Sequence, residues 1–117
     1  VEVRTGVAAD RIEPGRVLLP GGGAIEAATI VLAAGLSPNP VIAGLDLPKD
    51  KAGRVLTDAC MRVPGRPNVW AVGDCAAIPD PQGNPYPTLA QHALREGKHL
   101  AANIAAVVNG REPTPFV

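Results

Sequence analysis

The feature that most constrains the fold of this chain is an apolar run that stops at a Gly-Asp pair. Residues 69–72 read Val-Trp-Ala-Val, and Gly73 and Asp74 follow directly. An apolar run that ends so abruptly is typical of a buried parallel strand whose carboxyl end faces a ligand. Gly73 would let a ligand approach the backbone, and Asp74 offers an acceptor for sugar-type hydroxyls. The sequence therefore predicts a strand over residues 69–73 with a ligand contact at its end.

The best helix signal covers residues 88–109. Thr88 and Gln91 form a capping-box pattern at its start, and an Asn-Gly pair at 109 and 110 supplies a stop. Apolar residues recur between these ends at helical spacing: Ala90, Ala93, Leu94, Gly97, Ala101, Ile104 and Val108. The side chains on this face are small near the start of the helix, so a cofactor or another helix could approach closely there.

The first 26 residues predict an antiparallel meander. Two turn sequences, at 14–15 and 20–23, separate short strand candidates at residues 1–4, 7–12, 16–19 and 24–26. Residues 29–35 then form a continuous apolar run that ends in Gly35. A run that is apolar on both faces predicts a buried parallel strand.

The rest of the chain predicts mostly loops. Prolines at 38 and 40 break the chain, residues 41–45 predict one helical turn, and residues 53–57 predict a short strand. Four prolines within residues 78–87 exclude regular structure there, because proline lacks a backbone donor. Loops at strand ends commonly carry ligand contacts, so we expect some here.

Composition narrows the function classes. With 117 residues the chain is one domain at most, and its 11 basic and 11 acidic residues give a formal net charge of zero. Together with 3% aromatic residues, this balance does not favour nucleic acid or an anionic membrane as a partner. Cys60 and Cys75 lack metal-ligand spacing, and we interpret them as reduced thiols of a cytoplasmic protein.

Simpler interpretations stand beside the ligand-binding ones. Asp74 could merely cap a turn, and Gln91 could be only the capping partner of Thr88. His92, Glu96 and His99 share one helical face, which could hold a metal, but we expect a solvated outer face and predict no metal site.

Three segments in fixed order resemble the pyridine nucleotide–disulfide oxidoreductase superfamily: Leu32–Asn39, Asn68–Ala76 and Thr88–Gly97. The first is similar to the strand and glycine that close the NAD domain, the second to the flavin motif, and the third to the helix whose amino end faces the flavin. Within the superfamily, the Ala-Gln pair at 90 and 91 is most similar to the corresponding helix of type II NADH:quinone dehydrogenases. The Gly-x-Gly-x-x-Gly motif of the family is missing, and the chain starts on valine, so we expect a fragment.

The resemblance implies a partial two-dinucleotide-binding-domain flavoprotein fold of the α/β class. Residues 1–38 would be the tail of the NAD(P)-binding domain, and residues 39–117 the second segment of the FAD-binding domain. The implied cofactor-binding residues are Gly35, Gly73, Asp74, Ala90 and Gln91. Asp74 would accept hydrogen bonds from the ribityl hydroxyls of FAD, and backbone groups at Ala90 and Gln91 would donate to the isoalloxazine.

The same resemblance places the Gln91 side chain near the quinone end of the flavin. The family helix often carries a second glutamine four residues later, where this chain has Arg95. Arg95 shares a face with Gln91, so it could bond a quinone oxygen or be an exposed charge.

The implied function is that of a larger protein that passes electrons from NADH through FAD to a quinone. That protein would be peripheral on the inner face of the cell membrane, and the 117-residue chain alone would be inactive. Alternatives are a sulfide:quinone, ferredoxin or disulfide reductase of the same superfamily. Another is a non-catalytic interaction module that self-associates through the surface exposed by the missing domain half.

Overall fold

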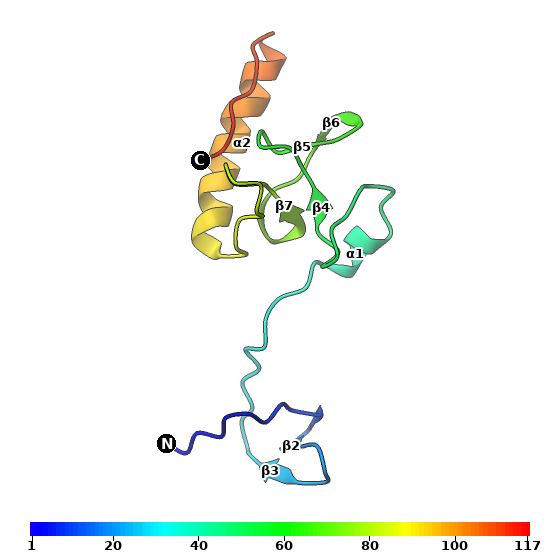
Figure 1. The fold of residues 1–117 in the computed structure, drawn as a ribbon, viewed down its shortest axis with the longest axis vertical. Helices are drawn as coiled ribbons and strands as arrows, with labels where there is room; N and C mark the ends of the chain where they lie inside the picture. Colours follow the sequence, from blue (N-terminus) through cyan, green and yellow to red (C-terminus); the bar gives the residue numbers. More distant parts are fainter. The chain divides into compact units, whose positions relative to one another are not determined.

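The computed structural model describes all 117 residues and mixes short strands with one long helix, which confirms the predicted α/β class. The chain forms two compact units, Val1–Ala34 and Gly35–Val117 (Figure 1). No helix combines the length and hydrophobicity that a bilayer span requires.

The first unit contains the predicted meander. Strands β1 (Arg11–Glu13), β2 (Arg16–Leu18) and β3 (Ala24–Glu26) pair antiparallel in that order. Gly15 in the first turn has φ 79°, a left-handed conformation that favours glycine. The strand expected over residues 1–4 does not form, and the second candidate is reduced to β1.

The buried parallel strand predicted over residues 29–35 is wrong. These residues form no strand, and the side chain of Val31 is 85% exposed. A strand that is apolar on both faces is stable only with paired edges and covered faces. The unit of residues 1–34 offers only the three-stranded meander, so the run stays unpaired.

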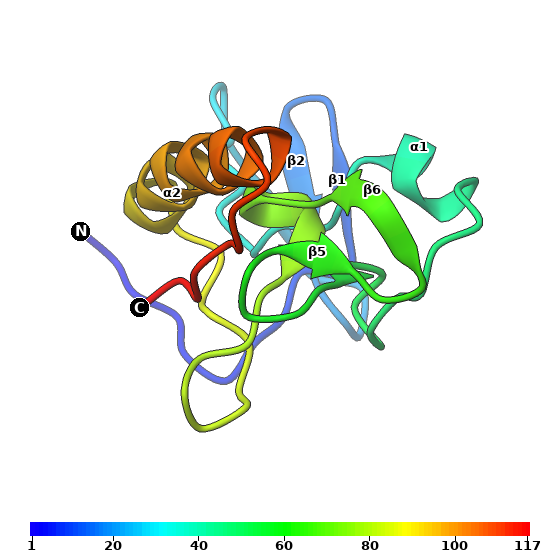
Figure 2. The same cartoon turned by 90° about the horizontal axis from the view of Figure 1, so that it is seen from above.

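The second unit is built around two small sheets. Strand β4 (Val55–Leu56) pairs parallel with β7 (Ala76–Ala77), and β5 (Arg62–Val63) pairs antiparallel with β6 (Arg66–Trp70). Helix α1 (Pro40–Ala43) is the expected single turn, and α2 (Ala90–Val108) lies alongside the strands (Figure 2). The buried hydrophobic core consists of Val55, Met61, Val63, Ala71, Ala76, Ile78 and Phe116.

The apolar run at 69–73 is not the parallel strand that we predicted. Its first two residues end β6, which pairs antiparallel with β5, and the chain then enters a 3₁₀ turn, η1 (Gly73–Cys75). The reason is the two-residue connection at Pro64 and Gly65, where Gly65 has φ 73°. A tight turn of this kind joins antiparallel neighbours, whereas parallel strands need a long crossover.

Three loops of the second unit repeat one hydrogen-bond pattern. Asp50, Asp58 and Asp80 each accept, through Oδ1, from the backbone N–H groups two and four residues later. The residue three positions after each aspartate has a positive φ. Two of these are glycines, and the third is Met61 with φ 72°, whose side chain is fully buried. Core packing therefore holds methionine in a backbone conformation that glycine would adopt more easily.

Asp50 is expected to make the stability of this unit depend on acid pH. Burial raises the pKa of Asp50, but hydrogen bonds from the backbone and side chain of Arg54 outweigh it, so the pKa lies below 3.8. Because the folded pKa is depressed, the stabilisation is complete above 3.8 and is lost as pH falls through the folded pKa.

We expect Asp50→Asn to lower the free energy of unfolding by about 0.5–1 kcal/mol near pH 7, because Oδ2 no longer pairs with the Arg54 guanidinium, while Oδ1 keeps its backbone donors. Urea unfolding measures the difference in free energy of unfolding between wild type and Asp50→Asn at pH 7 and again at pH 3. This difference should be smaller at pH 3. An equal difference at the two pH values would contradict this role of the carboxylate.

Helix α2 confirms the predicted helix, but its start differs. It begins at Ala90, the capping residue is Leu89, and no side chain caps the helix. The capping box of Thr88 and Gln91 therefore does not form. The loop over residues 78–87 is irregular as predicted, apart from an isolated bridge between Pro79 and Pro85.

The two most buried residues of α2 are polar, which reverses our expectation. Glu96 and Asn103 are buried, at 4% and 2% exposure, whereas Leu94 and Val108 on the apolar stripe are 69% and 79% exposed. The solvated outer face predicted for His92, Glu96 and His99 is therefore wrong. Buried polar groups are tolerated when they are hydrogen-bonded, and both Glu96 and Asn103 are.

Candidate functional site

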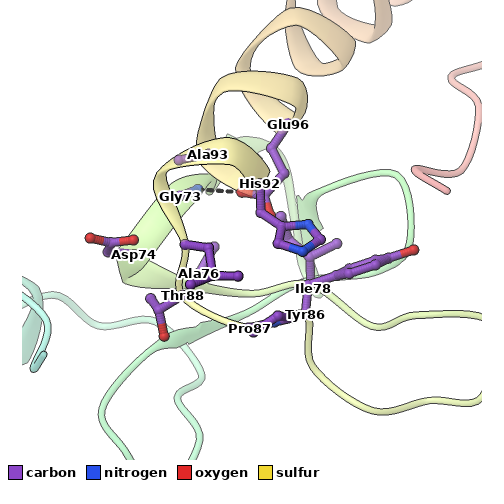
Figure 3. Close-up of a pocket in the computed structure, with 11 residues that line it drawn as sticks. Gly73, Asp74, Ala76, Ile78, Tyr86, Pro87, Thr88, His92, Ala93 and Glu96 are labelled. Carbon is purple, nitrogen blue, oxygen red and sulfur yellow. Dashed lines mark hydrogen bonds between the residues drawn. The ribbon is translucent and has the colours of Figure 1, made fainter. Parts of the chain in front are cut away.

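The candidate site lies where β6 ends and α2 begins. Gly73 opens η1 with φ 73°, in the left-handed region that favours glycine. A Cβ atom there would lie 3.6 Å from the Cβ of Ala93, an ordinary contact, so conformation rather than space requires glycine. The Gly73 N–H donates to Glu96 Oε2 at 2.8 Å, and this bond holds the turn against α2 (Figure 3).

The Asp74 side chain is exposed and makes no hydrogen bond or ion pair within the chain. Its carboxylate points away from the His92 ring, toward the opposite side of the turn (Figure 3). It does not cap the turn that follows, which answers the simpler interpretation of this residue. Both carboxylate oxygens are free to accept from a ligand.

The amino end of α2 presents free donors beside Asp74. The first bond of the helix is donated by Ala93 N to Leu89 O at 3.0 Å, so the N–H groups of Ala90, Gln91 and His92 have no partner within the helix. These groups carry the partial positive charge of the helix dipole. The helix end can therefore interact with a partly negative ligand atom.

Asp74 and Ala90 line one open groove of about 660 Å³ in the second unit. The other lining residues are Leu36, Thr88, Ala93 and Leu94. The groove is mainly apolar, with one carboxylate and one uncapped helix end. This combination suits a planar ligand that carries hydroxyl groups and a polar ring edge.

A second, much smaller pocket adjoins the Gly73 turn, and its lining includes His92, Tyr86 and Glu96 (Figure 3). Its volume of about 10 Å³ is room for about one water molecule. The His92 ring packs 5.3 Å from that of Tyr86, and His92 Nδ1 is buried without a hydrogen-bond partner. This pocket is too small for a cofactor.

The other predicted site residues lie outside the groove lining. Gln91 is exposed on the first turn of α2, and Gly35 is exposed with φ 102° at the start of the second unit. The Arg95 guanidinium donates to Val117 O at 2.9 Å and lies 5.3 Å from the ring of Phe116. The structure thus brings Gly73, Asp74 and Ala90 together and directs Arg95 toward the C-terminal segment.

The sequence predicted the structural roles of neither buried polar residue of α2: Glu96 was expected on a solvated face, and Asn103 was not singled out. Glu96 holds the Gly73 turn, and Asn103 holds the C-terminal segment. Asn103 Nδ2 donates to Cys60 O at 3.1 Å and Thr114 O at 2.9 Å, and its Oδ1 accepts from Thr114 N at 2.9 Å. The available signal was their spacing of seven residues, which places them on one helical face with Leu100.

Cys60 lies in surroundings that disfavour the thiolate form. Burial and, to a lesser extent, the charge of Asp58 raise the pKa of Cys60, which keeps the thiol protonated. Cys60 and Cys75 are both free.

The chain is similar to known proteins in sequence and in fold. A family model described as pyridine nucleotide-disulphide oxidoreductase matches residues 1–97. The internal alternative NAD(P)H-ubiquinone oxidoreductase A1, mitochondrial, of Arabidopsis thaliana is 38% identical over 91 residues, which cover 77% of this chain and 18% of that protein. The type II NADH:quinone oxidoreductase of Staphylococcus aureus is 37% identical over 67 residues, which cover 56% of this chain and 17% of that protein.

A solved structure shares the fold. The ferredoxin reductase for the CYP199A2 system from Rhodopseudomonas palustris superposes with a TM-score of 0.73 at 22% identity, covering 96% of this chain and 28% of that one. The chain thus spans less than a third of the length of each of these relatives.

Proposed function

This chain belongs to the pyridine nucleotide-disulphide oxidoreductase family, and we propose that it supplies one part of the FAD site of a larger NADH:quinone oxidoreductase. The observation that carries the proposal is the groove in which the free Asp74 carboxylate lies beside the uncapped amino end of α2. In this proposal residues 1–38 are the tail of the NAD(P)-binding domain and residues 39–117 the second segment of the FAD-binding domain.

The residues of the groove fit FAD. Asp74 can accept from the ribityl hydroxyls, and the N–H groups of Ala90 and Gln91 can donate to the oxygens of the flavin ring. Gly73, Ala90 and Ala93 have little or no side chain, so a flat ring can approach the backbone. The partial charge at the helix start contributes about 0.3–1 kcal/mol toward a negative ring edge. FAD itself would supply the chemistry, taking hydride from NADH and passing electrons to an acceptor.

A quinone is the acceptor that we propose, because the similar proteins of Arabidopsis thaliana and Staphylococcus aureus are named as oxidoreductases of ubiquinone and quinone. Gln91 is exposed beside the groove and is our candidate for the quinone side. Arg95 could take part only after leaving Val117 and Phe116, to which it is bound here. We place the complete protein on the inner face of the cell membrane as a peripheral protein.

The test is to express the complete protein, meaning the full-length polypeptide that contains these 117 residues, and to record its visible spectrum. We expect bound flavin and NADH oxidation that is faster with a soluble quinone as the acceptor than with a ferredoxin or a disulfide. We also expect sulfide, offered as an electron donor in place of NADH, not to reduce the quinone. The 117-residue chain with added FAD should oxidise no NADH. A colourless complete protein would contradict the proposal, and flavin without quinone activity would change only the acceptor.

A second candidate function is self-association, and the exposed apolar stripe of α2 favours it. Leu94, Ile104 and Val108 are large hydrophobic residues on this stripe, and each is exposed. Contiguous exposed apolar surface of this kind often marks an interface. In this alternative the chain would be a non-catalytic interaction module.

We expect the isolated chain to form dimers or larger species whose fraction rises with concentration, and Leu94→Lys to return it toward monomer. Light scattering behind a sizing column measures this. Lys98→Ala is the matched control, because Lys98 is exposed on α2 outside the stripe. A wild-type chain that stays monomeric at every concentration would rule this candidate out.

A further inference from the structure

The buried carboxyl group of Glu96 is poorly explained by stability alone. It lies on the core-facing side of α2, no basic side chain forms an ion pair with it, and its one hydrogen bond comes from Gly73 N–H. Burying a carboxyl group has a substantial desolvation cost, and one hydrogen bond offsets only part of it. An apolar side chain of similar size would fill the same space between the helix and the turn without that cost.

The hydrogen bond of Glu96 acts on the residue directly before Asp74. Gly73 is the first residue of η1, and glycine loses more conformational freedom on ordering than any other residue. Fixing the Gly73 N–H fixes the direction in which the chain leaves the turn. It therefore also restrains the backbone position from which the Asp74 side chain extends (Figure 3).

The same bond connects the two halves of the groove. Glu96 belongs to the same 19-residue helix as Ala90 and Gln91, whose N–H groups are the free donors. Six residues along a helix correspond to a rise of about 9 Å, so the donors and Glu96 move as one rigid body. One hydrogen bond thus sets the spacing between the acceptor at Asp74 and the donors at the helix start.

We propose that Glu96 is a positioning residue, which holds the Gly73–Asp74 turn at a set distance from the amino end of α2 and so determines how the flavin is oriented. This inference rests on the proposed function. Glu96 does not line the groove, and Gly73 is the one residue assigned to the cofactor site with which it forms a hydrogen bond, so its effect is transmitted through the Gly73 backbone.

Three variants of the complete protein test the role of the hydrogen bond. Glu96→Gln keeps an acceptor of the same shape, and we expect the Kd for FAD to stay within about threefold of wild type. Glu96→Leu keeps the size and loses the acceptor, and we expect the Kd to rise about tenfold and the visible circular dichroism of the flavin to change. Asn103→Leu is the control, because Asn103 is the other buried polar residue of α2 and bonds only Cys60 and Thr114.

The control separates positioning from general destabilisation. Asn103→Leu should lower the unfolding temperature and leave the flavin dichroism unchanged. The positioning role is overturned if Glu96→Leu and Asn103→Leu change the flavin dichroism equally. It is also overturned if Glu96→Gln binds FAD as weakly as Glu96→Leu. Glu96→Ala serves as the second acceptor-free variant if the leucine variant does not fold.

A measurement on the 117-residue chain tests the hydrogen bond between Glu96 and Gly73 without any flavin. We expect hydrogen exchange of the Gly73 amide, followed by NMR, to be about tenfold faster in Glu96→Leu than in wild type and nearly unchanged in Glu96→Gln. Faster exchange in a complete protein whose FAD affinity and dichroism do not change would overturn the positioning role and leave the proposed function standing. A complete protein without flavin would overturn both, even with the Gly73 contact confirmed.

Discussion

Replacing Asp74 with alanine in the complete protein is expected to weaken FAD binding about 10- to 100-fold, a loss of about 1.5–3 kcal/mol. The Asp74 carboxylate is exposed and has no partner within the chain, so its removal takes away ligand contacts and little else. Hydrogen bonds to a charged acceptor are the strong ones, and ribityl hydroxyls would donate one or two of them. Flavin titration followed by fluorescence measures the change.

The matched control is Asp46→Ala, because Asp46 is another exposed aspartate of the same unit and its only side-chain partner is the exposed Arg66. This control should retain the FAD affinity of wild type. Asp74→Asn should fall between wild type and Asp74→Ala, since an amide oxygen accepts more weakly than a carboxylate. Unchanged affinity in Asp74→Ala would remove this residue from the cofactor site.

Replacing Phe116 with alanine is expected to lower the free energy of unfolding of the second unit by about 3–5 kcal/mol. Phe116 is the aromatic residue of the buried core and is only 4% exposed. Its ring packs at 5.1 Å from Tyr86 and 5.7 Å from His99, both in edge-on geometry. Truncation would leave a cavity and remove the contact of the last residues with the core, and urea unfolding of the 117-residue chain would measure the loss of stability.

Phe116→Leu is the control, and it should lose less than half as much because most of the apolar volume remains. The alanine variant should also release Arg95, whose guanidinium lies 5.3 Å from the Phe116 ring. If Phe116→Ala changes stability by less than about 1 kcal/mol, the C-terminal segment is not part of the core.

The elements that could be predicted are those whose signals are local. The turn sequence at Pro14 and Gly15 predicts the hairpin of β1 and β2, because these residues suit the turn wherever the chain goes next. Helical spacing and the absence of proline predict α2, and the proline-rich loop before it is equally evident. Two residues of the groove were also candidates from the sequence: Asp74 because it ends an apolar run, and Ala90 because its segment resembles the flavin-facing helix of the family.

The pairing of strands depended on more than their hydrophobicity. The apolar runs at 29–35 and 69–73 both suggested buried parallel strands, and neither is one. A strand needs a partner edge, and its own sequence does not say whether that edge exists or in which direction it runs. For the second run the turn at Pro64 and Gly65 decided the direction, and the first run pairs with none of the three strands of its unit.

By itself, the sequence determined the meander, the long helix and the Gly-Asp boundary, because turn geometry and helical periodicity depend on neighbouring residues. Only the tertiary structure decided which face of α2 is buried. Glu96 is buried because Gly73, 23 residues earlier, offers an N–H, and Asn103 because Cys60 and Thr114 surround it with backbone partners. The burial of a polar group depends on hydrogen-bond partners that are distant in the sequence. The spacing of apolar residues along a helix does not reveal these partners.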